Sequence, residues 1–315
     1  MKSEKVPILL IVFNRLRTVQ ALIDAVRLYQ PTELFVAADG PRKDKPGEKE
    51  KCDEVRQWII EHVNWDCNLH TLFREENVGC GYGPSGAISW FFEHVEQGII
   101  LEDDCIPHPD FYEYAAELLE RYKDNENVYA INGSHDLTKK YGDGSYYFSM
   151  QNRPFHGWAT WRRAWRIFDF DLNGLTPLKL DCALLRYGAN NRERKYWKWE
   201  YSRVKNGHYK NSTWDYQFSM CIWRHHGCTI MPNVNLITNI GFGSDATHPF
   251  VETDQDAKRQ VSPIMPIQYP TSEKISRQSD LDYFVSHLQI FMDLTPWYKL
   301  LKRRIKRILG IPLSK

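Results

Sequence analysis

The stretch "GIILEDDCIPHPDFYEY", residues 98–114, decides the fold class. It opens with an apolar run, Ile99 to Leu101, of the kind that forms a strand buried on both faces. Three acidic residues follow at once. Pro109 then stands where a helix would begin, the position at which its missing N–H costs least. A buried strand, a charged edge and a helix in this order indicate an α/β unit.

The same alternation fills the first hundred residues. Apolar runs such as "VPILLIVFN" and "ELFVAADG" alternate with stretches whose apolar residues recur at helical spacing, as from Val19 to Val26. Strands that alternate with helices predict parallel pairing and right-handed crossovers. We therefore expect an α/β, Rossmann-like fold: a central, mostly parallel sheet flanked by helices. Beyond residue 150 the pattern predicts aromatic-rich loops and short helices.

Composition narrows the class of protein. The 315 residues are 42% hydrophobic and 14% aromatic, which excludes general disorder. Because 41 basic residues stand against 40 acidic ones, charge gives no indication of nucleic-acid binding. Seven scattered cysteines predict reduced thiols, and no apolar run approaches the ~20 residues that span a bilayer. A cytoplasmic protein is the expectation.

The domain organisation is expected to be simple. Residues 1–250 form one domain, 251–294 a polar extension that contains proline, and 295–312 a basic amphipathic helix. That helix carries six lysines and arginines and no acidic residue. This pattern favours peripheral contact with the anionic inner face of a membrane. A helix docked on its own domain, or an inert basic tail, remains the alternative.

Polar residues mark the ends of the predicted strands. In an open parallel sheet, ligands bind beyond the carboxyl ends of the strands. Those ends carry Phe13, Asn14, Arg15, Asp39, Glu102, Asp103 and Asp104. Like charges packed beside a buried strand need a compensating cation, and carboxylates suit Mn²⁺ or Mg²⁺. Such an ion would draw charge from a departing nucleoside diphosphate. Asp39, within "AADGPR", fits an ordinary turn equally well.

The second half offers an aromatic stretch and two polar residues. "FHGWATWRRAW", residues 155–165, and Trp214 predict a wall for sugar stacking built on Gly157, Trp158 and Trp214, with plain core packing as an equal alternative. Asp215 opens an apolar helix, where it is either a cap or a general base for an acceptor hydroxyl. His248 ends a Gly-rich loop, as a metal ligand or a surface residue.

A competing motif is present at residues 81–86. Gly81, Gly83 and Gly86 fit the G-x-G-x-x-G pattern of a dinucleotide site and would imply an NAD-dependent oxidoreductase. However, the preceding strand is expected to stop near Arg74, whereas the true fingerprint turns directly off its strand. Pro84 also fits a tight turn poorly. We rank this alternative well behind a nucleotide-sugar site.

Four other stretches of the sequence resemble those of the GT-A-fold nucleotide-sugar glycosyltransferases. Within that fold they are most similar to the N-acetylglucosaminyltransferase I type, as found in small bacterial relatives. "PILLIVFNR" with "AADG", "ILEDDCIPHPDFYEY", "FHGWATWRRAW" and "TWDYQF" carry the resemblance, which spans roughly residues 6–248. It implies an inverting, metal-dependent transferase in bacterial polysaccharide biosynthesis. The donor would be a nucleotide sugar, UDP-linked, and the acceptor a saccharide or a lipid-linked saccharide.

The resemblance also implies residue roles. Asp104 would bind Mn²⁺ or Mg²⁺ directly, with Glu102 and Asp103 facing the nucleotide. Phe13, Asn14, Arg15 and Asp39 stand where the family holds base and ribose. Asp215 would be the catalytic base, and His248 would complete metal or diphosphate contacts. A non-catalytic, membrane-associated saccharide-binding protein is the third hypothesis.

Overall fold

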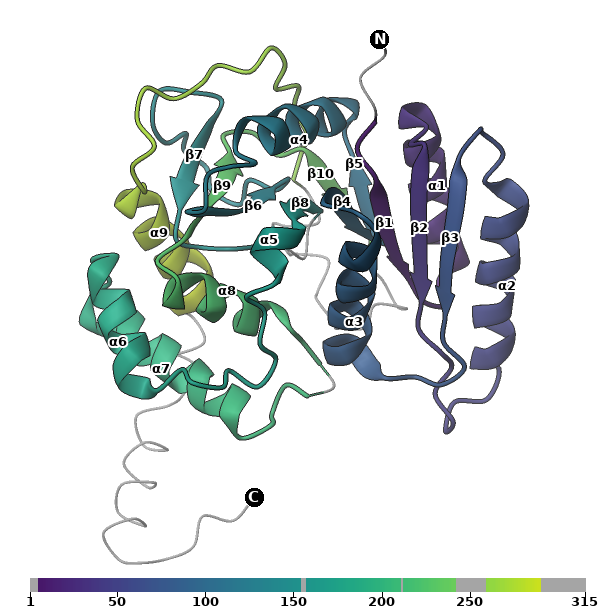
Figure 1. Ribbon diagram of the computed structural model, residues 1–315, viewed down its shortest axis with the longest axis horizontal. Helices are drawn as coiled ribbons and strands as arrows, with labels where there is room; N and C mark the ends of the chain where they lie inside the picture. The colour runs from purple at the N-terminus through teal and green to yellow at the C-terminus, as the bar shows by residue number, and fades with distance from the viewer. Residues whose placement is uncertain (1–4, 154–156, 211, 242–258, 290–315) are drawn as a thin grey trace, which may run out of the picture.

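The computed structural model describes residues 5–153, 157–210, 212–241 and 259–289 (Figure 1). Its main sheet has eight strands in the order β3-β2-β1-β4-β8-β6-β9-β7. The strands are β1 (Ile8–Val12), β2 (Glu33–Ala38), β3 (Asn68–Phe73), β4 (Gln97–Glu102), β5 (Cys105–Pro107), β6 (Val128–Asn132), β7 (Tyr146–Ser149), β8 (Trp158–Trp161), β9 (Cys228–Pro232) and β10 (Ile237–Asn239). The helices are α1 (Leu16–Tyr29), α2 (Glu48–His62), α3 (Gly79–His94), α4 (Pro109–Arg121), α5 (Arg162–Trp165), α6 (Pro177–Arg186), α7 (Asn191–Lys205), α8 (Asp215–Arg224) and α9 (Arg277–Tyr283), the last continued by the π-helical turn η3 (Phe284–Leu288).

The first four strands of the main sheet confirm the predicted parallel arrangement. β1 pairs in parallel with both β2 and β4, and β2 pairs in parallel with β3. The arrows of β1, β2 and β3 point to the same edge of the sheet in Figure 1. Every residue of β4 from Gly98 to Leu101 is buried, as expected for a strand covered on both faces.

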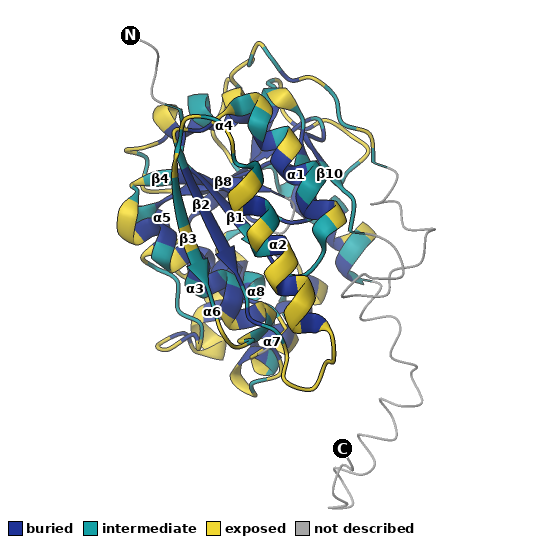
Figure 2. Cartoon of the chain, turned by 90° about the vertical axis from the view of Figure 1, so that its right-hand side faces the viewer, coloured by how far each residue is buried: buried dark blue, intermediate teal, exposed yellow. Residues whose placement is uncertain are grey.

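Helices cover both faces of this half. Figure 2 shows α1 and α2 on one face and α3 on the other. Residues Val19, Leu22, Ile23 and Val26 of α1 are fully buried, which is the periodic face read from the sequence. α4 begins at Pro109, and the His108 side chain accepts a hydrogen bond from the Asp110 amide at 3.2 Å. The fold class is therefore α/β, with helices flanking a mostly parallel central sheet.

The second half of the chain adds strands that periodicity did not predict. β8 lies between β4 and β6 and is antiparallel to both, while β6 pairs in parallel with β9. The expectation of loops and short helices beyond residue 150 was therefore incomplete. Strands of four or five residues, set among aromatic side chains, are too short to show a period.

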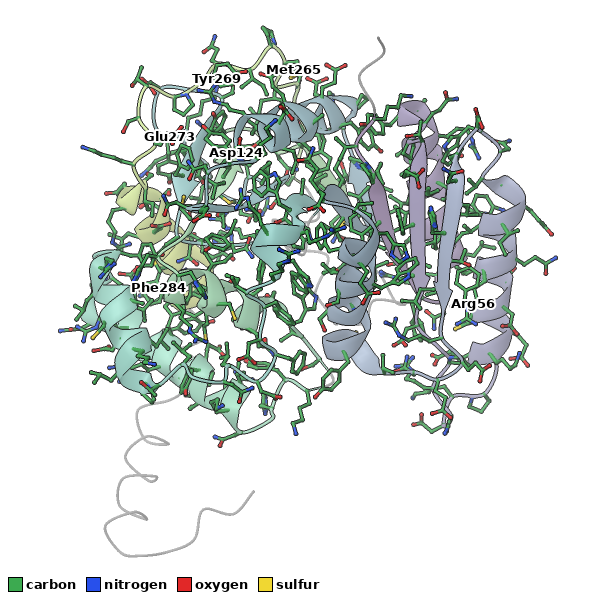
Figure 3. All side chains as sticks on the ribbon, in the orientation of Figure 1. Arg56, Asp124, Met265, Tyr269, Glu273 and Phe284 are labelled. Atoms are coloured by element: carbon green, nitrogen blue, oxygen red, sulfur yellow. The ribbon has the colours of Figure 1, made fainter. Side chains whose placement is uncertain are left out.

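Residues 259–289 return to the body of the molecule. Ile264 and Phe284, the latter labelled in Figure 3, are 7% and 1% exposed and belong to the main hydrophobic core. The proposed domain boundaries stay predictions, and residues 295–312 lie outside the described residues. Among the described helices, none is long and apolar enough to cross a membrane.

Candidate functional site

The polar strand ends meet at one edge of the sheet, as the sequence predicted. Val12 of β1 is in register with Ala38 of β2, and Ile11 is in register with Glu102 of β4. The residues that follow each strand therefore emerge side by side.

Arg15 connects the first strand to the acidic triplet. Its Nε donates to Asp103 Oδ2 at 3.3 Å, and its Nη2 donates to Asp103 Oδ1 and, at 2.9 Å, to Asp104 Oδ2. Burial alone would lower the pKa of Arg15, but the two carboxylates outweigh burial and raise it. The compensating cation that the sequence called for is thus supplied, in part, by the protein itself.

The three acids are unequal. Asp103 is 5% exposed, and burial raises its pKa to about 6 although Arg15 opposes the shift. Glu102 has a pKa well above its usual value, because of burial first and then the charges of Asp104, Asp103 and Asp215. Asp104 is the more exposed aspartate of the Arg15 pair, with 16% of its side chain accessible against 7% for Asp103. Of these two aspartates, Asp104 is the better placed to meet a ligand.

A short two-stranded sheet lies beside Asp104. β5, directly after the acids, pairs antiparallel with β10, and the Ile240 amide donates to the Asp104 carbonyl at 2.9 Å. A Cβ added to Gly241 would lie 2.2 Å from Asp104 Oδ2, so the backbone passes directly over this carboxylate. The Gly-rich loop that leads to His248 therefore starts at the acidic site. His248 itself lies outside the described residues.

Asp39 has a structural partner. Its carboxylate accepts hydrogen bonds from the amides of Gly40, Val78 and Gly79 at 3.0–3.2 Å, and so caps the start of α3. Arg56, labelled in Figure 3, fixes the same corner by donating to the Asp39 carbonyl at 3.0 Å. This arrangement matches the turn alternative, and a role at the ribose stays a prediction.

Phe13 and Asn14 belong to a cluster that the sequence did not reveal. Asn14 Nδ2 donates to Glu48 Oε1 at 3.1 Å, and the Arg42 amide donates to Glu48 Oε2 at 2.7 Å. The Arg42 guanidinium lies 5.6 Å from the centre of the Phe13 ring. Glu48, 5% exposed, organises the group. Its one signal in the sequence was its place in the first turn of a helix.

Asp215 approaches the acids from the other half of the molecule. It is the first residue of α8, and the Thr213 hydroxyl donates to its Oδ1. Burial raises the pKa of Asp215, while the Thr213 hydrogen bond opposes the shift. Its charge is near enough to raise the pKa of Glu102. The fold therefore brings Asp215 and the acidic triplet, 111 positions apart at Asp104, to one region.

The aromatic wall requires a correction. Trp158 and Trp214 are 1% and 4% exposed, and their ring centroids are 5.8 Å apart within the core. Phe218 of α8 packs on Trp158 at 5.7 Å. These rings hold α8 against the sheet and offer no open face to a sugar, so core packing was the right alternative. Gly157, with φ of 69°, is required where its backbone meets Ile237 and Leu101.

The dinucleotide motif is excluded by geometry. β3 ends at Phe73 and α3 begins at Gly79, so no glycine turns directly off the strand. Gly81, Gly83 and Gly86 all lie within α3. A Cβ at Gly81 would lie 2.5 Å from the Lys210 carbonyl oxygen. Glycine is therefore required here because the loop before Asp215 packs closely against α3.

The carboxylates at this edge form at most part of a coordination shell for a divalent ion. Within the described residues, no three His, Cys, Asp or Glu side chains converge as a metal cage. Mg²⁺ and Mn²⁺ sites in phosphate-transfer enzymes commonly use one or two carboxylates and complete the shell with water and substrate phosphates. Asp104, partly exposed beside Asp103, fits that smaller kind of site.

Comparison with known proteins gives only weak structural likenesses. No protein-family model matches the chain, and no curated protein matches its sequence. Similar solved structures include HddC from Yersinia pseudotuberculosis (11% identity, TM-score 0.33, covering 54% of this chain and 85% of HddC). S. aureus TarS 1–349 gives 13% identity and a TM-score of 0.35, over 50% of this chain and 47% of that one.

A third similar structure is a putative glucose-1-phosphate thymidylyltransferase from Bacillus anthracis in complex with a sucrose. It shows 10% identity and a TM-score of 0.32, over 65% of this chain and 85% of that one. Likenesses of this strength carry no functional argument.

Proposed function

We propose that the chain is an inverting, metal-assisted glycosyltransferase that moves a sugar from a nucleotide-diphosphate donor, UDP-linked, to a saccharide or lipid-linked saccharide. One observation supports this proposal above the others: a partly exposed aspartate at a parallel strand end, Asp104, and a lone carboxylate, Asp215, reach one region from opposite halves of the fold. Transfer from a nucleotide sugar needs these two groups in different roles.

The donor nucleotide would lie across the ends of β1 and β4. Ligands of open α/β sheets bind beyond the carboxyl ends of the strands. Phe13 offers an aromatic face to the base, backed by Arg42, and Asn14 offers an amide to the ribose. Arg15 holds Asp103 and Asp104 in place and lies close enough to contact the diphosphate. When bound at Asp104, Mn²⁺ or Mg²⁺ would stabilise the negative charge that forms on the departing diphosphate.

Asp215 would take the proton from the acceptor hydroxyl as that oxygen attacks the sugar carbon. The hydrogen bond from Thr213 to Oδ1 would fix the orientation of the carboxylate that accepts this proton. Burial raises the pKa of Asp215, which makes it a stronger base than an exposed aspartate. The core tryptophans pack α8 against the sheet and so fix the position of Asp215, the first residue of that helix.

Two further parts of the proposal concern surroundings. His248 would add a contact to the metal or the diphosphate, since its loop begins over Asp104. The basic segment 295–312 would bring the enzyme to an anionic membrane surface, where a lipid-linked acceptor is found. A non-catalytic sugar binder is less favoured, because the tryptophans that it would use are buried.

A thermal-shift screen of sugar nucleotides, each with and without Mn²⁺, tests the proposed function. A ligand at 100 times its Kd stabilises the folded chain by about 2.7 kcal/mol, so binders raise Tm by several degrees. We expect stabilisation by UDP-sugars that depends on Mn²⁺, and none by NADH. Stabilisation by NADH alone, or by no nucleotide at all, would contradict the proposal.

A further inference from the structure

A second arginine lies at the same edge of the sheet, beside the end of β6. Arg153 is 1% exposed. Its amide donates to Asn132 Oδ1 at 3.0 Å, and its Nη1 donates to Asp136 Oδ2, also at 3.0 Å. The Tyr283 ring of α9 covers one face of the guanidinium, 3.7 Å from Cζ. The backbone amide fixes the position of the residue, and the ion pair and the tyrosine ring fix its guanidinium.

One edge of this guanidinium is left over. Nε and Nη2 of Arg153 are buried, and neither makes a hydrogen bond of normal geometry within the described part of the chain. The buried Tyr147 hydroxyl, which also lacks such a partner, lies near enough for the charge of Arg153 to oppose the rise in the pKa of Tyr147. Their two N–H groups point the same way and form the fork that binds a carboxylate or phosphate in a bidentate manner. Leaving charged donors buried and unpaired costs more than leaving neutral ones, so a retained fork of this kind points to a ligand.

Neighbouring polar atoms share this state. His135 Nδ1, Ser134 Oγ and both amide atoms of Asn152 are buried without hydrogen-bond partners among the described residues. Burial, assisted by the charge of Arg153, lowers the pKa of His135 to about 4, so this imidazole is neutral. Neutral donors and acceptors beside a cationic fork suit a ligand that carries hydroxyl groups as well as an anionic group.

The local charge favours an anion. Asp136 is shared by two arginines, Arg153 and Arg259. Burial raises the pKa of nearby Asp280 to about 7, although the charges of Arg277 and Arg153 oppose the shift. Arg153 therefore shares one carboxylate, Asp136, with a second arginine, and lies near a second carboxyl group, Asp280, that is partly protonated at neutral pH. An oxyanion would balance the remaining positive charge.

The register of the sheet places this cluster near the acids. Ile100 of β4 and Asn132 of β6 both pair with Trp158 of β8. Glu102 and Ser134 each follow two residues later on strands that run in the same direction, so they stand level at the sheet edge. Two strand spacings of about 4.8 Å separate the strands, which puts the segments roughly 10 Å apart. One sugar unit spans much of that distance.

We propose that the Nε/Nη2 edge of Arg153, with Ser134, His135 and Asn152 around it, binds the carboxylate or phosphate of an acidic acceptor saccharide. That the bound sugar is an acceptor rests on the proposed function. That it carries an oxyanion rests on the geometry alone. The donor nucleotide would occupy the β1 side of Asp104, and the acceptor the β6 side. Because Arg153 is 1% exposed, side chains must move on binding, and a monosaccharide would bind at millimolar concentration.

Calorimetry with glucuronate, glucose 6-phosphate and glucose tests the proposal on the full chain at matched ionic strength. We expect wild type to bind at least one of the two anionic sugars tenfold or more tightly than glucose; which one it prefers distinguishes a carboxylate from a phosphate ligand. Arg153→Lys keeps the charge but loses the fork, and should lose tenfold or more of that affinity. Arg259→Lys makes the same change on the other partner of Asp136 and should stay within threefold of wild type.

Two outcomes would overturn the oxyanion site. One is equal binding of glucose and both anionic sugars by wild type, a result that requires no variant to fold. The other is unchanged affinity in Arg153→Lys. UDP binding with Mn²⁺, measured on the same samples, separates the two proposals. Loss of anionic-sugar binding with UDP binding intact removes only this inference, whereas absence of UDP binding in wild type removes the proposed function and leaves the oxyanion site standing.

Discussion

The molecule sets an arginine against an aspartate twice along one sheet edge, with different results. At the end of β1, the Nε/Nη2 edge of Arg15 is taken by Asp103. Beyond β6, the same edge of Arg153 has no partner among the described residues. In the first region the protein satisfies its own charges, and a ligand must compete with or extend that pairing. In the second region two donors of a buried guanidinium are left without hydrogen-bond partners among the described residues.

Asp215→Asn gives the largest expected effect on activity, because it removes the base while keeping the shape of the side chain. General-base catalysis typically contributes 10²–10⁴-fold, so we expect a loss of about that size in transfer rate. Nucleotide binding should be unchanged. Steady-state assays with a UDP-sugar, beside the exposed control Asp66→Asn, measure the loss. Transfer within threefold of wild type would remove Asp215 from the mechanism.

Trp158→Ala should destabilise the fold strongly, because this ring is 1% exposed and packs against Trp214 and Phe218. Truncation of a buried tryptophan costs about 3–5 kcal/mol. Trp199, which is 44% exposed, is the matched control, and its alanine variant should lose less than about 1 kcal/mol. Urea denaturation measures both. If Trp158→Ala were as stable as wild type but bound sugar more weakly, the result would contradict core packing and support sugar stacking on Trp158.

The contrast between the halves also shows how far the sequence could be interpreted. Strands β1 to β4 are covered on both faces by regular helices. Their apolar runs and polar ends can therefore be recognised from the local sequence alone. The burial of Trp158 depends on α8, 57 residues away in the chain, and no local pattern encodes that contact. Glu48 and Thr213 were missed for the same reason, since an acid in a first turn and a threonine before Trp-Asp look ordinary until their partners are known.

Arg15→Met tests whether the protein's own cation stabilises the acidic triplet. Removing one partner of a largely buried pair should cost roughly 3 kcal/mol, the low end of such losses, because Arg15 keeps 19% of its side chain exposed. Mn²⁺ should then raise the Tm of the variant more than that of wild type, since the ion takes over the compensation. Arg17→Met, exposed on the same helix, is the control. A variant as stable as wild type in metal-free buffer would show that Arg15 does not fill this role.

Asp181 offers the smallest effect and a clear dependence on pH. Hydrogen bonds from Arg194 and Lys198 lower its pKa to about 2. A carboxyl whose pKa is depressed in the folded state adds stability above the unfolded value near 3.9, and loses it as pH falls toward 2. Asp181→Asn should therefore lower Tm by only about 1–3 °C at pH 7, because the pair is near the surface. Melting curves from pH 7 to pH 3 should show the difference narrowing below pH 4; a difference that grows on acidification would contradict this assignment.

The most direct test of the central claim is the affinity for UDP measured by calorimetry with and without Mn²⁺, in wild type and in Asp104→Asn. The substitution keeps the size of the side chain and removes the charge that would hold the ion. The proposed function predicts that Mn²⁺ tightens UDP binding at least tenfold in wild type and has little effect in the variant. Affinity in wild type that does not depend on Mn²⁺, or a metal effect that survives in Asp104→Asn, would contradict it.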